Sequence, residues 1–154
     1  MKEKLTLEHL TSYLPYNVKV IIPNTSMRCT LSGINFKDKT IEVDYPRKKR
    51  QCCGEIISFF DGKDRRHNSY IDNCKLLLHP LSKLTEEIEH NGEKFIPLNK
   101  LSNHAYDVII DNNFVLEDIE RLLYRDIKKL FEWNFDVFDL HSKNLCIYYD
   151  ELKK

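Results

Sequence analysis

The chain has 154 residues, and its hydrophobic fraction of 42% is ordinary for a globular protein, which excludes a wholly disordered protein. No stretch is apolar enough to span a membrane, and the mixed charges of residues 1–9 exclude a signal peptide, so we expect a cytoplasmic protein. The net charge is zero, but residues 1–80 carry 14 Lys+Arg and 9 Asp+Glu, whereas residues 81–154 carry 10 and 15. A basic half can attract polyanions, or the two halves can neutralise each other.

The five cysteines are odd in number and have no repeated spacing. Such usage predicts reduced, mostly buried thiols and no disulfide framework. The cysteines are Cys29, Cys52, Cys53, Cys74 and Cys146.

A short amphipathic helix is predicted over residues 6–14, because Leu7, Leu10 and Leu14 recur at helical spacing and Pro15 ends the pattern. The strand-like segments that follow are rich in β-branched and aromatic residues and are bounded by turn residues. They lie at residues 18–22, 28–34, 40–45, 55–60 and 70–78. Five short strands predict that residues 16–79 form a small curled antiparallel sheet or an SH3-like barrel.

Residues 81–154 are predicted to be mainly helical. Leu81, Leu84 and Ile88 share one helical face after Ser82, a suitable N-cap, and residues 90–92 end that helix.

Three further elements are predicted before the last strand. Residues 93–98 should be extended, and residues 99–106 should form a helical turn. A continuous helix over residues 115–132 should start at the cap 111–113 and bury one apolar stripe. That stripe consists of Ile119, Leu122, Leu123, Ile127 and Leu130.

Residues 145–149 predict a final short strand. No linker-like stretch divides the chain. We therefore predict a single α+β domain over residues 1–154.

Two basic loops flank the predicted strand 55–60. Their cations are too crowded to be held inside a core and should project into solvent. They are Arg47, Lys48, Lys49, Arg50, Lys63, Arg65 and Arg66. Converging loops could bind phosphates while Phe59, Phe60 and Tyr70 stack on bases, but charged, solvated loops are also usual between strands. These seven residues are the candidate site for an anionic partner, either nucleic acid or an acidic protein face.

Metal, cofactor and catalysis are not expected. Enough zinc ligands exist, but they lack the paired spacing of known sites. They are Cys52, Cys53, His67, Cys74 and His79. The acidic run around Glu86 and His90 is typical of the wet face of a helix, and no glycine-rich phosphate loop is present.

The segment Glu132–Asp139 alternates apolar and polar residues. Such a cluster can form a partner-binding ridge, but more often it closes one end of a core. The second interpretation is favoured.

Three stretches, Leu5–Val20, Lys75–Leu98 and Leu130–Ile147, resemble an uncharacterised family of short proteins from phages, prophages and mobile elements of gut Bacteroidales. The resemblance implies a protein of the bacterial host's cytoplasm and carries no activity, cofactor or catalytic residue. Members of that family tend to have glycine near the positions of Asp139 and Asn144, and a shorter, less basic segment where residues 46–68 stand here.

These observations predict a non-enzymatic phage or mobile-element accessory protein that acts by binding a host or phage protein. The alternative is a small nucleic-acid-binding barrel that uses the basic loops 46–50 and 63–67.

Overall fold

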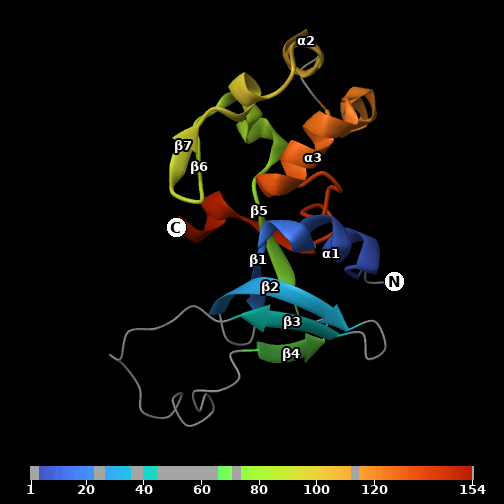
Figure 1. The fold of residues 1–154 in the computed structure, drawn as a ribbon, viewed down its shortest axis with the longest axis vertical. Helices are drawn as coiled ribbons and strands as arrows, with labels where there is room; N and C mark the ends of the chain where they lie inside the picture. The colour runs from blue at the N-terminus through green and yellow to red at the C-terminus, as the bar shows by residue number, and fades with distance from the viewer. Residues whose placement is uncertain are drawn as a thin grey trace. The chain divides into compact units, whose positions relative to one another are not determined.

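The computed structural model describes residues 4–22, 27–35, 40–44, 66–70, 74–111 and 115–153. It shows a mixed α+β protein with a small antiparallel-rich sheet, an N-terminal helix and a C-terminal helix, which confirms the predicted fold class (Figure 1). The chain divides into two compact units, Met1–Leu76 and Leu77–Lys154. The expectation of a single domain stays a prediction.

The first unit opens with helix α1, Leu7–Tyr13, within the predicted range. Thr6 caps it by accepting a hydrogen bond from His9 N, while Thr6 N donates to His9 Nδ1. The short 3₁₀ turn η1, Leu14–Tyr16, follows at Pro15. Asn17 then adopts a left-handed conformation with φ 54°, which redirects the chain into the sheet.

The sheet of the first unit contains strands β1 Lys19–Ile22, β2 Met27–Asn35, β3 Thr40–Asp44 and β4 Arg66–Tyr70. Their order is β4-β3-β2-β1 and every pair is antiparallel (Figure 1). Val20 lies opposite Cys29, and Leu31 lies opposite Val43. These four side chains are buried, as alternation along the strands requires.

The first three predicted strands are therefore confirmed. The predicted strand 55–60 lies outside the described residues. The fifth predicted segment, 70–78, contains strand β5, Lys75–Leu78, while strand β4, Arg66–Tyr70, covers residues that were expected mainly in a loop. Among the described strands no closed barrel is found.

The second unit begins with a 3₁₀ helix, η4 Leu81–Thr85, and a hairpin of β6 Ile88–His90 and β7 Glu93–Phe95. The prediction of a helix from Leu81 through Ile88 is wrong. Asn91 and Gly92 have φ of 53° and 82°, the two left-handed positions that a tight two-residue hairpin turn requires. The Asn-Gly turn signal therefore outweighs the apolar spacing.

The next elements are η5 Pro97–Lys100 and helix α2 Asn103–Asp111, so the helical turn expected at 99–106 is a longer helix that begins later. Ser102 caps the N-terminus of α2, because its Oγ accepts a hydrogen bond from Ala105 N at 3.2 Å. The buried carboxylate of Asp126 in turn accepts bonds from Ser102 N and Oγ, at 3.0 and 2.6 Å. The start of α2 is thus fixed by a side chain far along the sequence.

The predicted continuous helix over 115–132 is wrong. It is divided into a 3₁₀ helix, η6 Leu116–Arg121, and the α-helix α3 Tyr124–Glu132. The backbone is extended between them, with ψ of 150° at Leu122 and 146° at Leu123. Extended residues point to opposite sides, so Leu122 is 6% exposed and Leu123 is 42% exposed. The expected burial of Leu123 is therefore also wrong.

The core of the second unit joins residues from its hairpin region, its helices and the segment after α3. Its largest members include Leu84, Leu98, Ile119, Leu122, Leu130, Trp133 and Phe135. Strand β8, Cys146–Tyr148, confirms the predicted last strand, and η7, Tyr149–Lys153, follows it. None of the helices in the described ranges has the length and apolar character to cross a bilayer.

Candidate functional site

Of the seven predicted basic residues, only Arg66 falls in the described part of the chain. Arg47, Lys48, Lys49, Arg50, Lys63 and Arg65 lie outside the described residues, and Arg66 begins β4, opposite Asp44 of β3. The basic half of the sequence nevertheless coincides with the first unit. Residues 77–80 carry no charge, so Met1–Leu76 has all 14 Lys+Arg and 9 Asp+Glu of the first 80 residues.

The candidate zinc ligands are not assembled in the described part of the chain, where no three metal-binding side chains gather. Cys52 and Cys53 lie outside it. His79 is buried, with its ring stacked on Tyr149 at 4.4 Å and tilted against Phe135 at 5.6 Å between centroids. The absence of bound metal stays a prediction.

Cys29, Cys74 and Cys146 are buried, which confirms the expected burial of these three thiols. Burial, and then the neighbouring Cys74, raise the pKa of Cys29 to about 11. The Cys29 thiol is therefore protonated at neutral pH and unreactive.

Asp136 is the centre of a buried hydrogen-bond network. Its carboxylate, 2% exposed, accepts bonds from Leu140 N at 2.8 Å, His141 N at 3.0 Å and Tyr148 Oη at 3.2 Å. Burial, and then the charge of Asp136, raise the pKa of Tyr148, so that its hydroxyl keeps its proton and donates. The network holds the turn before β8 in place.

Most of the segment Glu132–Asp139 is buried. Trp133, Phe135 and Val137 are all buried, together with Asn134 and Asp136. The interpretation of this segment as part of the core is confirmed.

A group of exposed apolar side chains lies on α2, on η6 with the residue before it, and at the start of α3. Of the eight large apolar residues that are exposed in the described part of the chain, six fall between residues 106 and 124. They are Tyr106, Ile110, Val115, Leu116, Leu123 and Tyr124, here called the helical apolar surface. Elements α2 and η6 are in contact, and His104 Nε2 donates to the Arg121 carbonyl at 2.9 Å.

Single exposed apolar residues are usual on protein surfaces, but these six lie on three elements that follow one another in the chain. Tyr106 and Ile110 lie four residues apart, on one face of α2, and are 48% and 47% exposed. Tyr124, at the first position of α3, is 82% exposed. In the sequence, the four-residue spacing of Tyr106 and Ile110 indicates an apolar helix face. That spacing does not tell whether the face is exposed or packs on the core.

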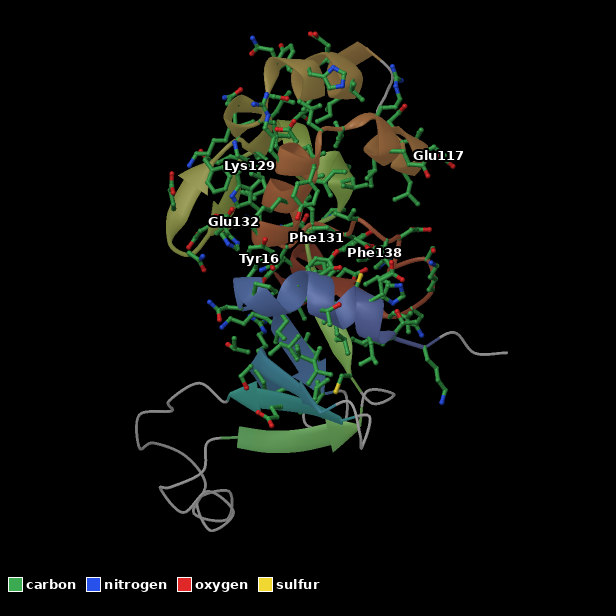
Figure 2. All side chains as sticks on the ribbon, turned by 45° about the vertical axis from the view of Figure 1, so that its right-hand side comes forward. Tyr16, Glu117, Lys129, Phe131, Glu132 and Phe138 are labelled. Carbon is green, nitrogen blue, oxygen red and sulfur yellow. The ribbon has the colours of Figure 1, made fainter. Side chains whose placement is uncertain are left out.

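A second feature is a hollow of about 310 Å³ within the second unit. It lies between the β6–β7 hairpin, η5 and α3. Its lining residues are His90, Asn91, Glu93, Phe95, Lys100, Lys129, Glu132 and Trp133. Figure 2 shows Lys129 and Glu132 on the side of α3 toward the hairpin, whereas Phe131 and Phe138 lie on the other side. Sequence reasoning missed this hollow, because its walls come from three separate elements.

Searches against protein-family models, curated proteins and solved structures find no match to this chain. The resemblance to phage and mobile-element proteins thus stays a prediction.

Proposed function

We propose that this is a non-enzymatic accessory protein that acts by binding another protein through the helical apolar surface. The observation that carries the proposal is the concentration of exposed apolar side chains on α2, η6 and the start of α3. Interfaces are centred on such residues, and tyrosine is enriched in them. Tyr106 and Tyr124 are the expected anchors, because each offers a large apolar ring with a hydroxyl that can reach a polar group.

The charges around this surface favour a partner with a basic rim. The exposed carboxylates Asp107, Glu117 and Glu120 lie on α2 and η6, and they outnumber the exposed cation Arg125 beside Tyr124, while Arg121 is engaged by Asp118 at 3.1 Å. Complementary charge around an apolar centre speeds association and selects the partner. The family resemblance supports a setting in a phage or mobile element, with a host or phage protein as the partner.

The proposal is tested by affinity capture from a bacterial host lysate treated with nuclease, followed by titration with the purified captured protein. Ile110→Glu and Tyr124→Glu place a charge in the helical apolar surface and should each weaken binding about tenfold or more. Asn103→Glu and Lys128→Glu are the matched controls, since both positions are exposed on the same helices. Equal affinity for all four variants would contradict the proposal.

A second candidate function is nucleic-acid binding by the basic loops 46–50 and 63–67. The observation that favours it is that the basic excess falls entirely within Met1–Leu76. Binding to DNA or RNA should then weaken steeply as salt rises, and Lys48→Glu with Lys49→Glu should flatten that dependence. Capture that disappears on nuclease treatment would favour this function over the first.

A further inference from the structure

The hollow beside the β6–β7 hairpin presents one cation and one anion that are not paired with each other. Lys129 and Glu132 lie one turn apart on the same side of α3 (Figure 2). The Lys129 ammonium donates to the Lys100 carbonyl and lies 5.9 Å from the centroid of the Trp133 ring. Within the described residues, neither side chain forms an ion pair. Both charges are therefore available to a ligand.

The other charges of the hollow are already balanced. Lys100 Nζ lies 2.5 Å from Glu93 Oε1 and 4.1 Å from the centroid of the Phe95 ring, which holds it against the hairpin. Burial lowers the pKa of His90, and the charge of Glu132 opposes that change only in part. His90 is therefore neutral at pH 7. What remains is a separated charge pair with no net charge.

We propose that this hollow binds a small zwitterion of the α-amino acid class, with its carboxylate at Lys129 and its ammonium group at Glu132. A simple anion would be attracted by Lys129 but repelled by Glu132, and a simple cation would be attracted by Glu132 but repelled by Lys129. A zwitterion satisfies both charges at once. The volume of about 310 Å³ is at the lower end for ligand sites and suits a single amino acid.

The walls of the hollow fit the remainder of such a ligand. Phe95 and Trp133 are in edge contact, with 5.1 Å between ring centroids, and both line the hollow. Their rings offer an apolar surface to a side chain, whereas Asn91 and His90 offer polar groups at the hairpin turn. The residues involved are all separate from the helical apolar surface, so this proposal does not depend on the proposed function.

The test is an NMR titration of the full chain with the common L-amino acids, followed by calorimetry on the best ligand. We expect saturable shifts of the amides of His90, Asn91, Glu132 and Trp133. For L-leucine, two analogues separate the charges: 4-methylpentanoate lacks the ammonium group, and 3-methylbutylamine lacks the carboxylate. Each analogue should bind about tenfold more weakly than the amino acid, because one charge-assisted contact is lost.

Variants identify the two contacts. Glu132→Gln should weaken amino-acid binding about tenfold while leaving the affinity for 4-methylpentanoate equal or higher, and Lys129→Met should weaken both ligands. Glu120→Gln and Lys128→Met, which remove exposed charges outside the hollow, should have no effect. If no amino acid gives saturable shifts, or if Glu132→Gln retains full amino-acid affinity in a folded protein, the proposal is wrong.

Discussion

Each of the two units is stabilised internally by a different kind of interaction. In Met1–Leu76, strands pair in antiparallel register and bury alternate side chains such as Cys29, Leu31 and Val43. In Leu77–Lys154, buried carboxylates accept hydrogen bonds from irregular backbone: Asp126 from Ser102, 24 residues earlier, and Asp136 from the turn that follows it. The comparison shows that paired strands satisfy their backbone hydrogen bonds by themselves, whereas irregular backbone takes side chains as partners.

Backbone conformation follows the same division. Within the described ranges, left-handed residues occur once in the first unit, at Asn17, and repeatedly in the second. The second unit contains Asn91, Gly92, Asn134, Asp139 and Asn144 in this conformation. Asn and Asp tolerate it better than most residues, so the second unit depends on residue identity at its turns.

The largest expected effect concerns the break between η6 and α3. Leu122→Asp should destabilise the protein by several kcal/mol, because it buries an unpaired charge. The same change at Leu123, which is exposed, should cost no more than about 0.5 kcal/mol. Chemical denaturation of both variants measures the difference. Equal decreases in the free energy of unfolding would instead support the continuous helix that the sequence pattern predicts.

The next effect tests the buried carboxylates of the second unit. Asp136→Ala should cost about 3 kcal/mol, since it leaves two backbone N–H groups and the Tyr148 hydroxyl without their acceptor. Asp107→Ala is the control, because Asp107 is exposed and its loss should be nearly neutral. A loss at Asp136 no larger than at Asp107 would show that side-chain acceptors do not stabilise this unit.

A smaller effect is expected at Asn144, whose φ is 61°. Asn144→Ala should destabilise the protein by about 1 kcal/mol, because a Cβ without a polar group disfavours left-handed backbone. Asn144→Gly should be close to neutral, since glycine adopts this conformation freely. Thermal unfolding of the pair is the measurement.

The smallest effect is a pH dependence. Because burial lowers the pKa of His90 below its ordinary value of 6.5, the unfolded chain binds a proton before the folded one. Stability should therefore fall as pH drops through 6.5 toward the folded pKa. His90→Gln should reduce that fall, and His104→Gln, at an exposed position, serves as the control. If the free energy of unfolding instead rose on acidification through this range, and rose less in His90→Gln, the prediction would be wrong.

Sequence patterns correctly predict the α+β class, helix α1 and strands β1 to β3 and β8, and cysteine usage predicts the burial of Cys29, Cys74 and Cys146. The predicted helix and strands depend on local signals, namely apolar periodicity and a proline after the first helix. Such signals act over a few residues and need no distant partner. They also gave the core position of Trp133 and Phe135.

Contacts between elements that are distant in sequence set the break at Leu122–Leu123, the start of α2 and the two candidate sites. The apolar stripe of residues 119–130 fits one long helix, but two shorter elements bury Leu122 while Asp126 binds Ser102, a residue 24 positions earlier. The hollow likewise needs the hairpin, η5 and α3 to meet, and exposure of Tyr106 and Tyr124 depends on what packs beside them. Periodicity along the chain cannot report such contacts, because they join residues that are distant in sequence.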